Sequence, residues 1–327
     1  MKKQLLFISA LLGIMAFAIV PLLYGTEIKV PVDKDLFFNP KAQKPIFLTL
    51  DDGTVLRTTG ENEMLENFKN FEVAISQPGK QSVSVSIPNE IVQINSIVRA
   101  AGNQVALIGM STGSVYEVVL IDVLRYKIAD HFMAFRPAPS PDGRFIAFIK
   151  FYPPHGYPSS YPTMGPSDFV MLYDTTRGPS GNRPPGVEID NKIDVGTAVY
   201  PPGVKTQDPN SWLREVDSNH ASGFFWDEDS SKFVFSAEHQ LKNTQTVTRM
   251  IKGKSVEVAK TEASLVLVDL TSPNTPKVRA FQADVCVGLC TEPLMSVEFG
   301  ASGLKAQLGV PPKQRTIEVQ YDQFTSP

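Results

Sequence analysis

This sequence has few cysteines, few histidines and no excess of basic residues, and each of these features excludes a class of structure or function. Only two of the 327 residues are cysteine, which excludes a fold held together by many disulfides. Lysine and arginine total 31 against 34 acidic residues, so a net charge of −3 gives no basic field for nucleic-acid phosphates. The four histidines show no metal-binding spacing. We therefore predict no nucleic-acid partner, no metal site and no cofactor.

Long apolar runs are also missing, except for one near the N-terminus. Lys2 and Lys3 precede an uncharged run at residues 5–24, the pattern of an export signal. This run is just long enough to span a bilayer, so cleavage and retention as a membrane anchor both remain open. We predict that residues 1–25 are a signal peptide or anchor, and that the body at 26–327 is periplasmic or extracellular.

The two cysteines lie close together in the sequence. Cys286 and Cys290 are separated by Val287-Gly288-Leu289. In an oxidising compartment a disulfide is the expected state, but it requires a turn because an extended strand would hold the two residues too far apart. Gly288 permits such a turn. We predict a Cys286–Cys290 disulfide, with two free buried thiols as the alternative.

After residue 25 the sequence consists of short β-prone runs separated by Gly, Asp, Asn, Ser and Pro, which indicates an all-β fold. Residues 61–69 are the best candidate for a helix. The predicted strands are residues 46–50, 55–58, 83–87, 105–110, 115–123, 145–151, 169–173, 232–237, 265–270, 305–308 and 316–321.

One turn-and-strand unit recurs along the chain. Its clearest copy is Ser140-Pro141-Asp142-Gly143-Arg144-Phe145-Ile146-Ala147-Phe148, and a degraded copy runs from Asp227 to Phe235. Asp and Gly favour a tight turn, and both faces of the following strand are apolar. We expect Phe145 and Ala147 to face one way, and Ile146 and Phe148 the other. Such a sheet must be sandwiched between neighbours, which is typical of radial repeats.

Two marks of the repeat occur in the same order. The turn residues align as Gly102, Gly143, Ser230 and Gly303. Apolar strands that end in aspartate follow the first three turns, at Asp122, Asp174 and Asp269. The separation of Gly102 and Gly143 suits one four-stranded blade.

The unit from Ser140 to Phe148, with the strand that ends at Asp174, resembles the repeat of the TolB-like (WD40-like, PD40) β-propellers. The copy from Trp226 to Phe235 is similar to the same repeat without its proline and glycine. The resemblance implies a β-propeller of about six or seven four-stranded blades. It also implies a bacterial envelope protein, commonly a non-enzymatic one, or a propeller appended to a hydrolase.

The stretch at residues 152–222 departs from the repeat and is rich in proline and tyrosine. We expect a long insertion there, because consecutive prolines cannot join a sheet ladder. Long insertions in repeat proteins often carry the binding surface. The predicted binding residues are Tyr152, His155, Tyr157 and Tyr161. The alternative is a loop that packs its own tyrosines over a blade edge.

Two sequence motifs that match a catalytic site and a calcium site are better explained as turns. Ser111 lies in Gly109-Met110-Ser111-Thr112-Gly113, which matches the hydrolase nucleophile elbow, but a second strand follows where that elbow needs a helix. Asp227, Asp229, Ser231 and Glu238 have a calcium-loop spacing, but Lys232 occupies the position that needs glycine. We predict a hairpin turn at the first and a solvated β-turn at the second.

These features favour an exported, non-catalytic β-propeller that binds or scaffolds proteins in the cell envelope. An alternative is a propeller enzyme acting on a carbohydrate or lactone through carboxylates that face the channel. A different β architecture, such as a pair of sandwiches, is a further alternative. We expect the Ser140–Phe148 motif itself to be structural, and the insertion that follows it to carry the binding.

Overall fold

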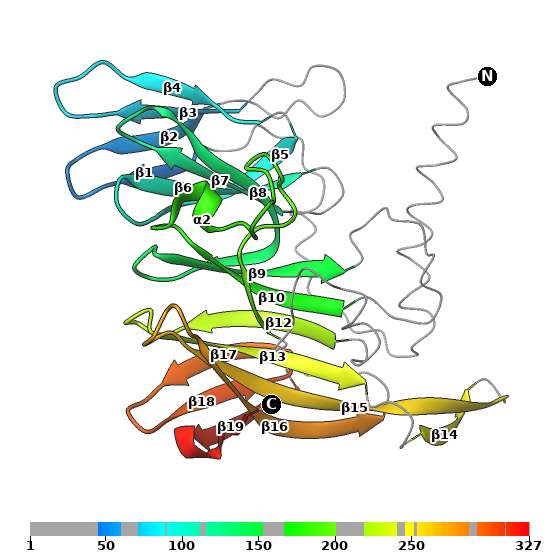
Figure 1. Ribbon diagram of the computed structural model, residues 1–327. Coiled ribbons are helices and arrows are strands. Elements are labelled where there is room, and N and C mark those ends of the chain that lie inside the picture. Colours follow the sequence, from blue (N-terminus) through cyan, green and yellow to red (C-terminus); the bar gives the residue numbers. More distant parts are fainter. Residues whose placement is uncertain are drawn as a thin grey trace, which may run out of the picture. The chain divides into compact units, whose positions relative to one another are not determined.

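The computed structural model of this chain describes residues 45–59, 71–88, 90–111, 116–152, 167–200, 219–240, 246–251, 254–287, 293–310 and 312–326. These residues are almost entirely β-strands joined by turns, with a short helix, α2 (Gly178–Gly181), and a 3-10 turn at Tyr321–Gln323 (Figure 1). The prediction of an all-β fold is confirmed. Within this part of the chain, no helix is long and apolar enough to cross a membrane.

The strands form antiparallel sheets that follow one another along the chain, and we number them 1 to 5. Sheet 1 contains β1 (Phe47–Thr49), β2 (Val55–Thr59), β3 (Glu72–Ser76) and β4 (Val83–Ser86). Sheet 2 contains β5 (Ile91–Arg99), β6 (Gln104–Ser111), β7 (Tyr116–Asp122) and the first half of β8 (Lys127–Pro139). Sheet 3 contains the second half of β8, β9 (Phe145–Tyr152), β10 (Ser167–Asp174) and β11 (Thr197–Tyr200).

Sheets 4 and 5 complete the described strands. Sheet 4 contains β12 (Asn219–Trp226), β13 (Lys232–Gln240), β15 (Lys254–Asp269) and β16 (Lys277–Val287), and β14 (Thr246–Ile251) pairs with the start of β15. Sheet 5 contains β17 (Leu294–Phe299), β18 (Gly303–Leu308) and β19 (Arg315–Gln320). The first strands of neighbouring sheets contact each other, β1 with β5, β8 with β12 and β12 with β17.

Strand β8 belongs to two sheets because it bends in the middle. Its first half pairs with β7 and its second half with β9. The register shifts between Phe135 and Ala138, and Arg136 between them has a φ of 51°. A bulge of this kind bends a strand and increases its twist. The bend lets the chain leave sheet 2 and begin sheet 3 without a loop.

The hydrophobic core lies between successive sheets. One cluster joins sheets 1 and 2, a second joins sheets 2 and 3, a third joins sheets 3 and 4, and a fourth joins sheets 4 and 5. Ile146 and Phe148 belong to the cluster shared with sheet 2, whereas Phe145 and Ala147 belong to the cluster shared with sheet 4. The predicted facing of these four residues is therefore confirmed, and so is the burial of both faces of their strand.

The recurring turn joins the first and second strands of a sheet. Gly102, Gly143 and Ser230 all have positive φ, at 68°, 72° and 57°. The same backbone hydrogen bond then ties each turn to the end of the third strand. Four sheets contain it: Val123 N donates to Asn103 O, Thr175 N to Arg144 O, Leu270 N to Ser231 O and Tyr321 N to Ser302 O, at 2.7 to 2.9 Å.

This hydrogen-bonded frame explains why the two sequence marks occur together. In sheets 2, 3 and 4 the third strand ends in an aspartate that lies opposite the first residue after the turn, Asp122 opposite Gln104, Asp174 opposite Phe145 and Asp269 opposite Lys232. In sheet 5 the corresponding pair is Gly303 and Gln320. The alignment on Gly303 is therefore wrong by two residues: Gly303 begins β18 and does not have the positive φ of the other turn residues.

Part of the predicted insertion at 152–222 belongs to the repeat. Strands β10 and β11 lie inside it and complete sheet 3, and β12 begins within it. The candidate helix at 61–69 lies outside the described residues. Strands β3, β5, β8, β11, β12, β14, β16 and β17 were not predicted, in most cases because polar residues interrupt their apolar alternation.

The segment after α2 is anchored to sheet 2 by a buried ion pair. Arg183 donates from Nη2 to Asp130 Oδ1 at 2.7 Å and from Nη1 to Oδ2 at 2.9 Å. The Tyr173 hydroxyl donates to Asp130 Oδ2 at 2.6 Å, and its ring stacks on Phe132. Arg183 also donates to the backbone carbonyls of Asn191 and Pro179. The Asp130 carboxylate thus accepts hydrogen bonds from two side chains, and the Arg183 guanidinium donates to acceptors in three residues.

Two buried tyrosines make the stability of this fold sensitive to high pH. Burial, reinforced by the charge of Asp130, raises the pKa of Tyr173 well above its usual value, and burial with the charge of Glu262 does the same for Tyr200. Tyrosines of the unfolded chain ionise near pH 10. The stability that the fold gains by keeping these two tyrosines neutral is therefore fully present below about pH 10 and is lost as the pH rises further. Phenolate absorbance should show Tyr173 and Tyr200 ionising only as the circular dichroism of the fold disappears.

The Tyr200→Phe variant serves as the control for that titration, because it should reduce by one the number of tyrosines that ionise only on unfolding. Ionisation of all tyrosines near pH 10 in a still-folded chain would contradict the assignment.

Candidate functional site

The residues predicted to bind or to form a disulfide lie mostly outside the described part of the chain. Tyr152 ends β9 with its backbone opposite Ser167, and His155, Tyr157 and Tyr161 fall in the undescribed range 153–166. Cys286 lies in β16 with its backbone opposite Thr261, and Cys290 falls in the undescribed range 288–292. The tyrosine surface and the disulfide therefore stay predictions.

The described residues around the two motifs judged to be turns agree with that prediction, although residues 112–115 of the first lie outside the described part of the chain. Ser111 ends β6, which pairs antiparallel with β7 as a hairpin requires. Asp227 Oδ1 accepts the Lys232 N–H at 2.9 Å, and its Oδ2 accepts the Ser231 hydroxyl at 2.6 Å. This carboxylate closes its own turn. Among the described residues, no group of three or more His, Cys, Asp or Glu side chains is placed to hold a metal ion.

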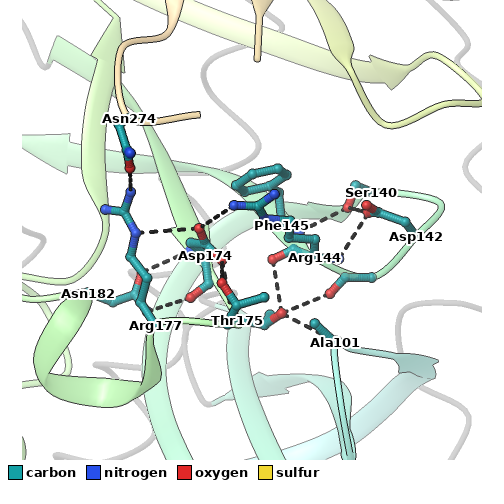
Figure 2. Close-up of polar contacts among 12 residues, drawn as sticks. Ala101, Ser140, Asp142, Arg144, Phe145, Asp174, Thr175, Arg177, Asn182 and Asn274 are labelled. Carbon is teal, nitrogen blue, oxygen red and sulfur yellow. Dashed lines mark hydrogen bonds and ion pairs between the residues drawn. The ribbon is translucent and has the colours of Figure 1, made fainter. Parts of the chain in front are cut away.

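The Ser140-Pro141-Asp142-Gly143 motif holds its own turn through two side chains (Figure 2). The Ser140 hydroxyl donates to Asp142 Oδ1 at 2.6 Å and accepts the Phe145 N–H at 2.9 Å. Asp142 Oδ1 also accepts the Arg144 N–H at 3.0 Å. These bonds fix the entry into β9, as the sequence predicted for a structural motif.

The same motif also connects three sheets. The Ala101 N–H of sheet 2 donates to the Gly143 carbonyl at 3.1 Å and to Thr175 Oγ1 at 3.2 Å (Figure 2). On the other side, the Asp142 N–H donates to Ser230 Oγ of sheet 4 at 3.0 Å. We call the edge that carries these turns, at residues 101–104, 140–145, 174–177 and 227–231, the turn edge. Its turns are held by contacts between neighbouring sheets and form a rigid surface.

Two arginines on the turn edge share one carboxylate. Arg144 Nη2 and Arg177 Nε each lie 3.4 Å from Asp174 Oδ2 (Figure 2). Asp174 Oδ1 accepts the N–H and the hydroxyl of Thr176, and Arg177 donates to Asn274 Oδ1 of sheet 4 at 2.6 Å. These bonds brace the corner between β10 and α2, and they occupy the Asp174 carboxylate.

A recess of about 400 Å³ opens on the turn edge between sheets 2 and 3. Its walls are the turn between β5 and β6 at residues 101–104, the turn between β7 and β8 with Asp122, Leu124 and Arg125, and Thr175 and Thr176 of sheet 3. This volume lies within the range of small-ligand sites, about 300 to 1,000 Å³. The recess can therefore hold a side chain or a short loop of a partner.

Two side chains of the recess, Gln104 and Asp122, present hydrogen-bond acceptors. Gln104 Oε1 is buried and has no hydrogen-bond partner among the described residues. Asp122 Oδ1 accepts the N–H groups of Leu124 and Arg125, both at 3.0 Å. Arg125 Nε lies 3.7 Å from Asp122 Oδ2, beyond hydrogen-bonding distance, and its side chain is 73% exposed. A buried acceptor without a partner costs free energy that a bound donor or water would recover.

One acid–base pair lies away from the recess and is closed to solvent. Glu117 on β7 contacts His131 on β8, and both side chains are almost entirely buried. Lys192 and Glu90 form a second, more exposed pair at 3.2 Å, and the His131 charge helps to lower the pKa of Glu90 after the larger effects of backbone and Lys192 hydrogen bonds. We assign the Glu117–His131 pair to the packing of sheet 2.

Sequence reasoning singled out Gly102 and Asp122 as marks of the repeat but did not assign them to a site. The recess needs residues from two sheets, and the contact between Ala101 and Thr175 spans 74 positions of the chain. Spacing along the sequence contains no signal for such a contact.

No family model matches the sequence, and no curated protein matches it. Among solved structures, hydrazine synthase of Kuenenia stuttgartiensis is 12% identical with a TM-score of 0.38, covering 81% of this chain and 64% of that one. The β-propeller domain of the Trilobed protease of Pyrococcus furiosus is 9% identical with a TM-score of 0.33, covering 85% and 83%. The GH93 α-L-arabinofuranosidase of Fusarium graminearum is 12% identical with a TM-score of 0.28, covering 87% and 94%.

This chain thus spans less than two thirds of the hydrazine synthase chain, and it spans 40% of a prolyl endopeptidase that also matches. Likeness at these identities and TM-scores carries no argument about activity.

Proposed function

We propose that this chain is an exported, non-catalytic β-propeller of the TolB-like kind, which binds protein partners in the cell envelope through its turn edge. The observation that carries the proposal is the recess between sheets 2 and 3, where Gln104 Oε1 is buried without a partner among the described residues. A site with unused hydrogen-bonding capacity on a rigid edge suits recognition. The predicted Tyr152–Tyr161 surface is proposed as a second contact region.

Several features of the sheets support the propeller. Successive antiparallel sheets pack face to face, and the first strands of neighbouring sheets contact each other. Radial repetition accounts for both features, because it buries each sheet between two others. The TolB-like assignment rests on the residues of the Ser140–Phe148 repeat, and the blade number of six or seven is part of the same proposal.

Three aspartates that end strands of sheets 2, 3 and 4 cap their own turns, a structural role that needs no catalytic chemistry. Asp122, Asp174 and Asp269 each accept backbone N–H groups from the residues that follow them. Burial raises the pKa of Asp269, but its hydrogen bonds from Thr271 and the nearby charges of Lys232 and Arg279 outweigh that effect and hold the pKa below its usual range. This capping occupies Oδ1 of each carboxylate.

Blocking the recess tests the proposal. Leu124 is an exposed residue of the recess wall, so Leu124→Trp should place bulk over the opening with little effect on folding. Partners captured from the native envelope by the full chain should be lost with this variant. The matched control is Met295→Trp, at a similarly exposed apolar residue of sheet 5, which should keep them. Equal capture by both variants would contradict binding at the recess.

A further inference from the structure

We infer that the recess takes the cationic side chain of a partner protein, the guanidinium of an arginine or the ammonium of a lysine, between Gln104 and Asp122. This inference rests on the proposed function and names the ligand class for the same site.

The two acceptors are placed to act together. Gln104 begins β6 and Asp122 ends β7, and they are direct partners in the antiparallel register, so their side chains leave the sheet on the same face. Both line the recess. The side chains of such a pair begin about 5 Å apart, which suits a group with several N–H donors in a fork.

Each of the two acceptors has an oxygen that can accept a further hydrogen bond from a ligand. Gln104 Oε1 is buried without a partner among the described residues. Asp122 commits Oδ1 to the two backbone N–H groups of its turn, and among the described residues Oδ2 has only a loose contact with Arg125 at 3.7 Å. A donor that reaches both Gln104 Oε1 and Asp122 Oδ2 would complete the pair, and a charged donor would form the stronger bonds.

Arg125 is a weak internal competitor for this site. It is the cation nearest to Asp122 in the recess wall, but its exposure and its 3.7 Å distance show that it is not locked in place. Lys127 lies opposite Asp122 in the β7–β8 register and is also exposed. A partner cation must displace Arg125 and tolerate Lys127, so removing Arg125 should strengthen binding rather than weaken it.

The test is a titration of the full chain with Nα-acetyl-arginine amide, followed by nuclear magnetic resonance. The uncharged isostere Nα-acetyl-citrulline amide is the control probe. We expect saturable binding of the arginine probe and at least about tenfold weaker binding of the citrulline probe, because a charge-assisted bond to Asp122 is lost. Added salt should weaken only the arginine probe.

Three variants measure the separate effects of Asp122, Gln104 and Arg125 on binding of the arginine probe. Asp122→Asn keeps an acceptor for the turn and removes the charge, so it should weaken the arginine probe about tenfold. Gln104→Glu offers an oxygen in either orientation of the side chain and should strengthen binding. Arg125→Ala should strengthen it about threefold through loss of the competitor. The matched control is Asp269→Asn, which changes the equivalent turn of sheet 4 and should leave binding unchanged.

Equal binding of both probes, unchanged binding by Asp122→Asn, or no saturation with the arginine probe would overturn the cation assignment. If Leu124→Trp still abolishes partner capture in that case, the recess binds partners through another chemistry and the proposed function stands. If partner capture also survives Leu124→Trp, both proposals fail.

Discussion

Replacing Arg183 by leucine should lower the free energy of unfolding by about 3 to 5 kcal/mol. The Arg183 and Asp130 side chains are only 1% and 3% exposed. Removal of the guanidinium would leave the Asp130 carboxylate buried, with the Tyr173 hydroxyl and the His131 backbone N–H as its remaining partners in the described part of the chain. The cost is that of an uncompensated buried charge. Urea unfolding measures it without adding the salt that guanidinium chloride would contribute.

The chain contains a control with the same chemistry in a different environment. Arg99 forms the same two-pronged contact with Asp51, at 2.5 and 2.7 Å, but these side chains are 45% and 87% exposed. Water and salt screen such a pair, so Arg99→Leu should leave the urea midpoint almost unchanged. Equal destabilisation by the two substitutions would contradict the role assigned to burial.

A double variant distinguishes the charge from the packing. Arg183→Leu with Asp130→Leu removes both charges and should be less destabilised than Arg183→Leu alone, because no unpaired buried charge remains. A purely additive loss would instead assign the effect to the shape of the two side chains. Tyr173 loses its acceptor in the double variant, which limits the recovery.

The strands with continuous apolar pattern were predictable from local sequence. In β6, β7, β9 and β10, apolar residues occupy both faces, and turn residues bound each run. In contrast, β8 contains Asp130, His131 and Arg136, and these residues interrupt the pattern. The structure uses Asp130 in the buried pair with Arg183 and Arg136 at the bend. The strand was missed because its polar residues serve contacts with segments far away in the sequence.

The candidate site was less predictable than the fold. Gly102 and Asp122 were recognised as repeat marks, and their turn chemistry was sufficient to explain them. What makes them part of a recess is the position of Thr175 on the neighbouring sheet. Arg183 illustrates the same limit, since it lies 53 positions from Asp130 in a proline-rich stretch expected to be a loop. Local propensity contains no information about such pairs.

Gly143→Ala should destabilise the chain by about 2 to 5 kcal/mol, the sum of two separate costs. A left-handed conformation costs an L-residue about 1 to 2 kcal/mol, and Gly143 has φ of +72°. The added Cβ would also lie 2.5 Å from the Arg99 carbonyl oxygen and 2.9 Å from Ala100 Cα, both backbone atoms of sheet 2. Overpacking of this kind costs about 1 to 3 kcal/mol.

Gly102→Ala separates those two costs. Gly102 has nearly the same φ, +68°, but a Cβ added there meets no atom of the described chain within 4 Å. It should therefore lose only the conformational part, about 1 to 2 kcal/mol. The difference between the two variants measures how closely sheet 3 approaches the backbone of sheet 2. Equal losses would mean that sheet 2 yields to the new methyl group.

Ser230 extends this comparison to the next sheet. It holds the equivalent turn position in sheet 4 with φ of +57°, and its hydroxyl accepts the Asp142 N–H. Ser230→Gly should relieve backbone strain of about 1 to 2 kcal/mol and remove one hydrogen bond worth about 1 kcal/mol. Its net effect on the urea midpoint should be small. A large loss would show that the bond from Asp142 to Ser230 holds sheets 3 and 4 together, and that serine replaces glycine there to make this contact.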